Sequence, residues 1–390
     1  MAIVPRWYWG CIVAPLVGTR VWLVGAALLG VRLLPSDPGY LAQWCVADSA
    51  YPGSPLRFDW LDLFARWDGC WYMDIALNGY SYQPGHPSNV MFAPLLPALM
   101  RAGTWLLGSS DPERLAQVGL AIANVSLLVA LAYQFALLRA ELGALAAGRA
   151  VLYLLVFPTS VFLSALYPHA LFLALGAAAL YHARRGQWWL VAILSACLAL
   201  TRIYGGLIAL PLAWEYVAQN RRRAERWIDW GALRIMIGPL TASGWTLYLW
   251  TVTGGPEGLA ETARTWNRSP VAPWDIASHM QTLSATLAWV SVDPGPLVDG
   301  AAAAAFVGLT LAAWKWISPT LALFGTVLLA AVLSTSQLLS VSRYVLEIMP
   351  AFAVLGLLGQ RRWFNMLYLT VAGTLCTMRT IGFALGYWVA

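Results

Sequence analysis

The chain has 390 residues, of which 60% are hydrophobic and only 11% charged, and its mean hydropathy is +0.64. This composition excludes a soluble globular protein, in which about a quarter of the residues are charged. The net charge of +6 comes almost entirely from arginine. We interpret it as a guide to membrane topology and not as a sign of nucleic-acid binding.

Apolar stretches long enough to cross a bilayer recur along the chain, and arginine clusters separate them. We expect the first one to be a retained helix, because it lacks a small-x-small cleavage site. The expected membrane helices lie near 9–33, 115–138, 148–165, 169–184, 187–203, 204–219, 229–252, 297–316, 318–340, 344–359 and 363–387.

The distribution of arginine predicts which ends of these helices face the cytoplasm. Basic clusters fall on one side of the membrane only if the segment 91–108 does not cross it. Two prolines and the central Arg101 favour that arrangement. The sequence therefore predicts an all-α polytopic membrane protein, a single domain over 1–390 with about eleven transmembrane helices and a cytoplasmic N-terminus. The clusters expected inside are at 139–149, 184–185, 221–226, 315 and 361–362.

Two regions are expected to project from the outer face, at 34–114 and 254–296. In the first, the stretch 59–78 is typical of one or two short amphipathic helices that lie in the membrane interface. It combines aromatic residues with several carboxylates, as chemistry at a membrane surface requires. Cys45 and Cys70 share this region, and a disulfide between them is possible if it lies outside the cytoplasm.

Asp68 is the most informative of these carboxylates, and two interpretations of it stay open. Its position before Gly69 fits an N-cap of a helix over 69–78, which Gly79 then ends. The alternative is a catalytic carboxylate in an aromatic-rich outer loop. Asp62 and Arg66 are spaced as an i,i+4 ion pair, and Asp74 fits the polar face of an interfacial helix.

Three arginines are expected near the outer face, in different parts of the chain: Arg202, Arg268 and Arg343. An arginine at membrane depth needs a partner, and the phosphate of a lipid-linked substrate is one candidate. The alternative is that each side chain reaches the head groups from a helix end. The histidines at 86, 169 and 279 lie in separate segments without metal-ligand spacing, so we predict no metal site and no other cofactor.

Several motifs resemble those of the PIG-V-type integral-membrane mannosyltransferases, which include GPI mannosyltransferase 2 and bacterial relatives. The strongest is RWDGCWYMDIALNGY followed by FAPLLPALMR; others are FPTSVFLSALYPHALF, LALTRIYGG and SRYVLEIMPAF. The resemblance runs from about residue 57 to about 355. One departure is His169, which stands where the family has an acidic residue, preceded by Pro168 instead of a small hydroxyl residue.

The resemblance implies a GT-C scaffold with interfacial helices in the first outer loop. It also implies transfer of mannose from a polyprenyl-phosphate donor to a lipid or glycan acceptor on the extracytoplasmic side of a bacterial-type plasma membrane. Asp68 occupies the position of the catalytic carboxylate, and Arg202, Arg268 and Arg343 are candidates for binding the donor phosphate. Candidate pocket residues are Arg66, Trp67, Trp71, Tyr72, Asp74, Tyr80, Tyr167, His169 and Tyr344.

An alternative from another functional class is a non-catalytic transporter or flippase of lipid-linked sugars. Such proteins place broken helices and polar groups at the membrane midplane and often contain inverted repeats. Here the acidic residues are expected on one face, and no internal repeat is evident. The sequence therefore favours a transferase over a transporter.

Overall fold

The computed structural model describes residues 8–36, 63–109, 111–222, 230–266, 268–272, 274–275, 278, 295–335, 338 and 340–389. Regular structure in these ranges is helical, apart from one isolated bridge between Pro270 and Thr335. The helices up to residue 208 are η1 (Trp9–Val13), α2 (Ala14–Leu33), α4 (Asp68–Asn78), η2 (Asn89–Met91), α5 (Leu95–Leu106), α6 (Pro112–Leu155), η3 (Ser160–Leu163), α7 (His169–Arg184), α8 (Trp188–Thr201) and η4 (Ile203–Ile208). Those that follow are α9 (Ala209–Arg222), η5 (Trp230–Met236), α10 (Ile237–Thr253), α11 (Pro256–Thr265), α13 (Gly295–Trp316), α14 (Pro319–Leu333), α15 (Val341–Tyr344), η6 (Val345–Glu347), α16 (Met349–Leu358) and α17 (Arg362–Ala384).

The all-α membrane class predicted from the sequence is confirmed. Four described helices are long and apolar enough to cross a membrane, and the pair Val341–Glu347 and Met349–Leu358, bent by 86°, forms a fifth candidate. Two further apolar helices, α8 and α14, are shorter than a full span. The count of eleven spans stays a prediction. The four long candidates are Trp9–Leu33, Pro112–Leu155, Leu297–Trp316 and Arg362–Ala384.

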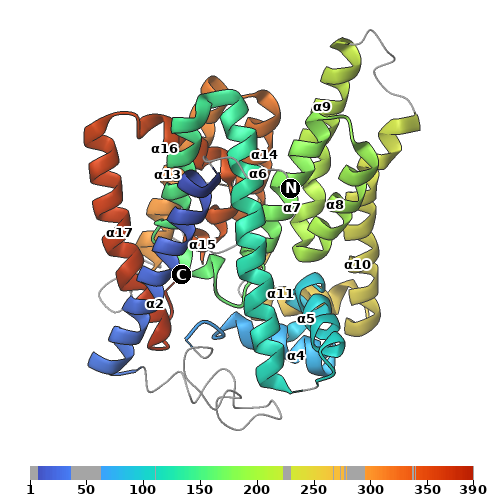
Figure 1. The fold of residues 1–390 in the computed structure, drawn as a ribbon. Helices are drawn as coiled ribbons and strands as arrows, with labels where there is room; N and C mark the ends of the chain where they lie inside the picture. The colour runs from blue at the N-terminus through green and yellow to red at the C-terminus, as the bar shows by residue number, and fades with distance from the viewer. Residues whose placement is uncertain are drawn as a thin grey trace.

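The short helices α4, α5 and α11 gather at one end of the bundle, beside the start of α6 (Figure 1). α5 has 12 residues, a length of about 18 Å at 1.5 Å per residue, which is well short of the apolar core of a bilayer. That length supports the prediction that the segment 91–108 does not cross. α4 provides one helix within the stretch expected to be interfacial, while residues 59–62 lie outside the described residues.

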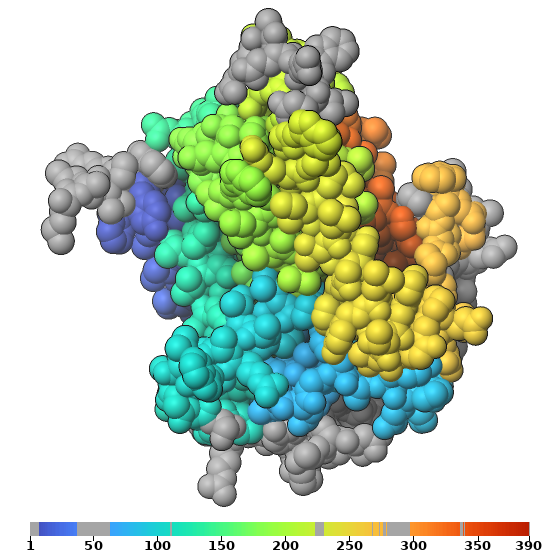
Figure 2. Space-filling model, turned by 90° about the vertical axis from the view of Figure 1, so that its right-hand side faces the viewer, coloured from blue at the N-terminus to red at the C-terminus, as the bar shows by residue number. Residues whose placement is uncertain are grey.

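The two regions predicted to lie on the outer face, called the outer regions below, contact each other at this end. Glu261 of α11 accepts hydrogen bonds from the Tyr82 hydroxyl at 2.7 Å and from the Gly85 N–H at 2.9 Å. The Trp266 indole N–H donates to the Ser88 carbonyl at 3.1 Å. Figure 2 shows α11, in yellow, against the blue segment that follows α4. The second outer region thus packs on the first.

An ion pair lies at the opposite end of the bundle. α7 has 16 residues, from His169 to Arg184, and is about 24 Å long. At the end of α7, Arg184 pairs with Glu141, and both contact Ser318. This contact joins the bend of α6 to the turns between α7 and α8 and between α13 and α14, which brings together several turns that the sequence assigned to one face.

The helix predicted at 148–165 extends beyond the point where the helix ends in the structure. The expected helices 115–138 and 148–165 are the two parts of α6, which are separated by a break at Gly143, where φ is 80° and ψ is 167°; the second part ends at Leu155. The reason is Pro158, which has no N–H to donate and disfavours helical geometry in the residue before it. Residues 156–168 instead form turns and the short helix η3.

The predicted bounds of the helices at 318–340 and 344–359 are also wrong. α14 ends at Leu333, and the chain then forms α15 and η6 before it bends into α16. Pro350 explains the bend, because proline is suited to the first turn of a helix and not to its interior. The expected helices 204–219 and 229–252 each begin with a turn of 3-10 helix. These interruptions matter because the broken segments carry the polar site residues.

Candidate functional site

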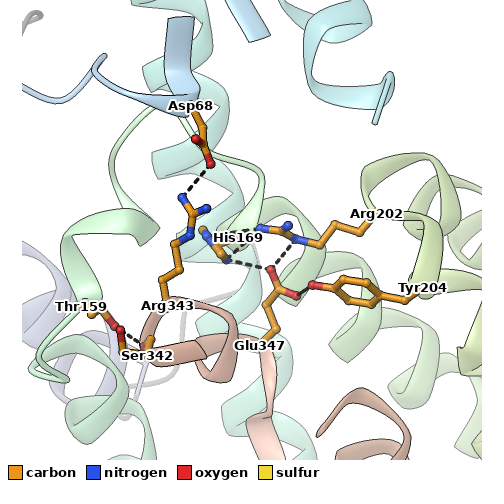
Figure 3. Close-up of polar contacts among 8 residues, drawn as sticks. All are labelled: Asp68, Thr159, His169, Arg202, Tyr204, Ser342, Arg343 and Glu347. Carbon is orange, nitrogen blue, oxygen red and sulfur yellow. Dashed lines mark hydrogen bonds and ion pairs between the residues drawn. The ribbon is translucent and has the colours of Figure 1, made fainter. Parts of the chain in front are cut away.

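Asp68 is the first residue of α4, and its carboxylate pairs with an arginine from the far end of the sequence. Arg343 Nη1 lies 2.7 Å from Asp68 Oδ2 (Figure 3), although the N–H is not aligned for a hydrogen bond. The backbone N–H of Asp68 donates to the Tyr167 hydroxyl at 3.1 Å. Trp67, and not Asp68, is the N-cap residue, so the capping interpretation of Asp68 is not supported.

The residue before Asp68 has an unusual backbone. Trp67 has φ 56° and ψ −122°, which non-glycine residues rarely adopt and which costs on the order of 1–3 kcal/mol. The Trp67 ring packs edge-on against Trp388 at 5.1 Å. Such strain persists only where surrounding contacts enforce it. Here it turns the chain so that the carboxylate of Asp68 meets Arg343.

Aromatic rings surround the guanidinium of Arg343. Its Cζ atom lies 5.6 Å from the ring centre of Phe162, 5.5 Å from Tyr167, 5.1 Å from Tyr344 and 5.0 Å from Trp388. The side chain is only 4% exposed. Rings at these distances attract a cation and limit its movement. Arg343 is therefore a fixed positive charge beside Asp68.

All three arginines predicted to bind phosphate gather around one ring. Besides Arg343, the guanidinium carbons of Arg202 and Arg268 lie 4.7 and 5.1 Å from the centre of Tyr344. These residues come from the start of η4, the segment after α11, and α15. Three guanidiniums so close together repel one another unless anions offset them. Their arrangement is suited to an anionic group.

Sequence reasoning missed the second carboxylate of this cluster, Glu347, which is 1% exposed. Its Oε1 accepts a hydrogen bond from Arg202 Nε at 2.7 Å and lies 2.8 Å from Nδ1 of His169. Its Oε2 accepts from the Tyr204 hydroxyl at 2.6 Å. The sequence did contain a feature that could have identified Glu347, because a glutamate inside an apolar stretch such as VLEIMP is costly without a partner.

Tyr72 also faces this cluster from the second turn of α4. Burial raises the pKa of its hydroxyl above the ordinary value, although the positive charge of Arg202 opposes the shift. The hydroxyl therefore stays protonated at neutral pH and is available as a hydrogen-bond donor. Tyr167 stacks on His169, with ring centres 6.0 Å apart. Tyr72, Tyr167, His169 and Tyr344 thus belong to one group with Asp68.

Other predicted pocket residues serve the packing of the outer region. Asp74 accepts hydrogen bonds from Asn78 at 2.8 Å and Asn89 at 2.7 Å. The Tyr80 hydroxyl donates to the Phe92 carbonyl at 2.8 Å. Trp71 stacks on Phe92, with ring centres 5.8 Å apart. These contacts hold α4 on the segment that follows it.

Arg66 and Cys70 flank the site residues of the first outer region. Arg66 is buried, and its expected partner Asp62 lies outside the described residues. Cys70 is disulfide-bonded, whereas Cys11, Cys197 and Cys376 are free thiols. The expected partner of Cys70, Cys45, also lies outside the described residues.

The described residues contain no group of three histidine, cysteine or acidic side chains able to hold a metal ion. His86 is exposed, His169 is buried against Glu347, and His279 lies outside the described residues. The absence of a metal site in the whole protein stays a prediction.

Comparison with known proteins bears directly on the resemblance seen in the motifs. A family model described as Mannosyltransferase (PIG-V) matches residues 36–214. The resemblance to PIG-V-type mannosyltransferases is confirmed. The matched range includes Asp68, Tyr167, His169 and Arg202, and it ends before Arg268 and Arg343. No curated protein matches the chain.

Two solved structures with a similar course of the chain are ArnT and an archaeal oligosaccharyltransferase. ArnT from Cupriavidus metallidurans, bound to undecaprenyl phosphate, is 14% identical with a TM-score of 0.46, and the alignment covers 91% of this chain and 62% of that chain. The archaeal oligosaccharyltransferase AglB from Archaeoglobus fulgidus, in complex with an inhibitory peptide and a dolichol-phosphate, is 13% identical with a TM-score of 0.48, covering 98% and 56%. The chain thus spans less than two thirds of either protein. With TM-scores below 0.5, neither likeness bears on the chemistry of the site.

Proposed function

We propose that the protein has a GT-C scaffold and is an inverting glycosyltransferase that moves mannose from a polyprenyl-phosphate donor to a hydroxyl of a lipid or glycan acceptor. The site faces the extracytoplasmic side of a bacterial-type plasma membrane. The single observation that carries the proposal is the Asp68–Arg343 pair beside Arg202 and Arg268. It combines a partly exposed carboxylate with a cluster of cations at the end of the bundle that holds the short helices.

Each group has a role in the transfer. Asp68 takes the proton of the acceptor hydroxyl, whose oxygen forms a new bond to C1 of the sugar from the side opposite the phosphate. The bond between C1 and the phosphate oxygen breaks, and its electron pair stays on that oxygen. The products are the glycosylated acceptor and polyprenyl phosphate. The phosphate gains a negative charge in this step, and nearby guanidiniums stabilise that gain.

The hydrogen-bonding state of Arg343 supports this role. Its Nε atom is buried and has no hydrogen-bond partner among the described residues. A buried donor without an acceptor costs on the order of 1–3 kcal/mol, and a phosphate oxygen can remove that cost. Arg343 can therefore contact Asp68 through one nitrogen and a donor phosphate through another.

The experiment compares purified wild type and Asp68→Asn, with radiolabelled polyprenyl-phosphate mannose as donor and a total membrane lipid extract as acceptor. We expect Asp68→Asn to fold in detergent and to lose activity by a factor on the order of 100–10,000, because the amide cannot take the proton. A new labelled product also distinguishes transfer from transport of the intact donor.

Glu113→Gln provides a matched control, because Glu113 lies at the start of α6, contacts Gln117 and has no contact with the site. It is expected to transfer mannose like the wild type. If Asp68→Asn keeps most of its activity while Asp62→Asn or Asp74→Asn abolishes transfer, Asp68 is not the base.

A further inference from the structure

His169 and Glu347 have no part in the proposed reaction, although they are among the most deeply buried polar residues of the cluster. His169 is 0% exposed and Glu347 1%. They come from the start of α7 and from η6, and they meet Arg202 at the break between α8 and η4 (Figure 3). Three interruptions of membrane helices therefore converge on this trio. Burying a charged pair in this way is costly, so its geometry needs a reason.

The contacts determine where the protons lie. Nδ1 of His169 is 2.8 Å from a carboxylate oxygen of Glu347, so Nδ1 carries the hydrogen and donates it. Arg202 Nη2 lies 3.1 and 3.2 Å from the two ring nitrogens, so the guanidinium packs directly against the imidazole. A protonated imidazole at that distance would repel the guanidinium. His169 is therefore neutral, and its Nδ1–H is used by Glu347.

The same contacts restrict Arg202. Glu347 holds its Nε atom at 2.7 Å, while the His169 ring packs against Nη2. Nη1 has no hydrogen bond to a described residue, and the Arg202 side chain remains 12% exposed. An arginine side chain has several rotatable bonds, and contacts on two of its nitrogens remove most of that freedom. The guanidinium carbon lies 4.7 Å from the centre of the Tyr344 ring, around which Arg268 and Arg343 also lie.

We propose that Glu347 and His169 are positioning residues that fix the guanidinium of Arg202 for the donor phosphate. This inference rests on the proposed transfer reaction. Neither residue touches the reacting atoms in this scheme, and His169 takes no proton from the acceptor. Because Glu347 already neutralises the charge of Arg202, this arginine adds little net charge to the cluster. Its role is to direct a hydrogen bond to the phosphate. Its contact with the phosphate is therefore most valuable in the transition state, where the phosphate gains charge.

If Glu347 positions Arg202, substitution of Glu347 should change kcat and the KM for donor in different ways. In Glu347→Gln the carbonyl oxygen of the amide can still accept from Arg202 Nε, but the negative charge that holds the guanidinium is lost. We expect kcat to fall by about 100-fold, as a misplaced catalytic group causes. The KM for donor should not rise, because the cluster gains one positive charge and still attracts the phosphate.

Two substitutions of His169 should reduce kcat to different extents. The side-chain amide of His169→Asn can take the place of Nδ1–H toward Glu347, whereas His169→Ala has no donor. We expect kcat to decrease in the order wild type, His169→Asn, His169→Ala, with the pH profile of wild type retained in His169→Asn. Loss of one limb of that profile would mean that His169 itself transfers a proton and would overturn the proposal.

The experiment measures donor-dependent kinetics with radiolabelled polyprenyl-phosphate mannose and lipid extract, together with thermal unfolding in detergent. Glu215→Gln is the matched control. Glu215 accepts a hydrogen bond from Thr320 at 2.6 Å, two residues after Ser318 and away from the site, so its substitution should affect kcat little. Wild-type turnover tests the proposed function separately. If wild type transfers mannose but Glu347→Gln has a wild-type kcat, or changes KM alone, Glu347 does not position Arg202. A kcat loss fully explained by unfolded protein also counts against the inference.

Discussion

Arg268 differs from the other two arginines of the cluster in its neighbours. Arg343 pairs with Asp68 and Arg202 with Glu347, whereas no acidic side chain of the described residues forms an ion pair with Arg268. Two carboxylates against three guanidiniums leave one positive charge. A phosphodiester carries one negative charge, so the charge of the cluster complements that of a polyprenyl-phosphate sugar.

We therefore predict that Arg268→Ala raises the KM for donor by a factor of about 10–100, which corresponds to the loss of a charged hydrogen bond of about 1.5–3 kcal/mol. The effect should diminish in high salt, because screening weakens attraction of the donor in the wild type as well. Arg264→Ala removes the same charge four residues earlier, from an exposed position in α11, and should leave KM unchanged. An equal effect of both variants would show that only general charge matters.

At the scale of elements, the irregular segment 156–168 is held in place from several sides. Arg20 of α2 donates to the Leu155 carbonyl at 3.1 Å and to the Ser164 hydroxyl at 2.8 Å. Asn124 donates to the Ser164 carbonyl at 3.2 Å. Backbone groups that a broken helix leaves unpaired are costly in a membrane, and these side chains satisfy some of them. The segment can therefore present Tyr167 and His169 to the site.

A second irregular segment, around α15, depends on Asp299 of α13. The buried carboxylate of Asp299 accepts from the N–H groups of Ser340 at 2.7 Å and Ser342 at 2.8 Å. Ser340 has φ 63°, a left-handed conformation that serine rarely adopts. Thr159 adds a hydrogen bond to the Ser342 carbonyl at 2.6 Å, which links the two irregular segments. Asp299 thereby fixes the turn that carries Arg343.

Asp299→Ala is expected to lower both stability and transfer activity. It leaves two buried N–H groups without their acceptor, at about 1–3 kcal/mol each, and frees the turn that carries Arg343. Asp299→Asn keeps one acceptor oxygen and should fall between wild type and Asp299→Ala. Thermal unfolding in detergent and transfer assays measure both effects. Wild-type behaviour of Asp299→Ala in both assays would contradict the assignment.

At the scale of the whole molecule, the site cluster and the Glu141–Arg184 contact lie at opposite ends of α7. The site lies where the short helices α4 and α11 gather, and the Glu141–Arg184 contact lies about one helix length away (Figure 1). Such a division fits an enzyme with its chemistry at one membrane face. It does not resemble a transporter with a central site at the midplane between inverted repeats.

The positive charge of the site also leads to a prediction about metal dependence. In the proposed reaction the leaving group is a polyprenyl monophosphate, and the three arginines around Tyr344 can stabilise its charge without a divalent ion. We expect transfer activity to be unchanged after dialysis against EDTA and not to increase with added Mg²⁺ or Mn²⁺. Loss of turnover on chelation, restored by one divalent ion, would show that carboxylates of the outer region bind a metal.

The sequence alone predicted the membrane class and the position of α7, and it singled out Asp68, Arg202, Arg268 and Arg343 as candidate site residues. These inferences depend on properties that are local in the chain. Apolar length predicts a membrane helix, and an arginine or aspartate near a membrane needs a partner whatever the fold. The motif around Asp68 likewise lies within a single short segment.

Only the tertiary structure decided which groups are partners. Glu347 lies 178 residues from His169 and 145 from Arg202, and no local pattern predicts that they meet. The same holds for Asp299 and the turn before Arg343. Pro158 and Pro350 interrupt the predicted helices 148–165 and 344–359, and distant side chains stabilise the interruptions. Contacts between distant segments, which sequence periodicity does not encode, therefore build the site.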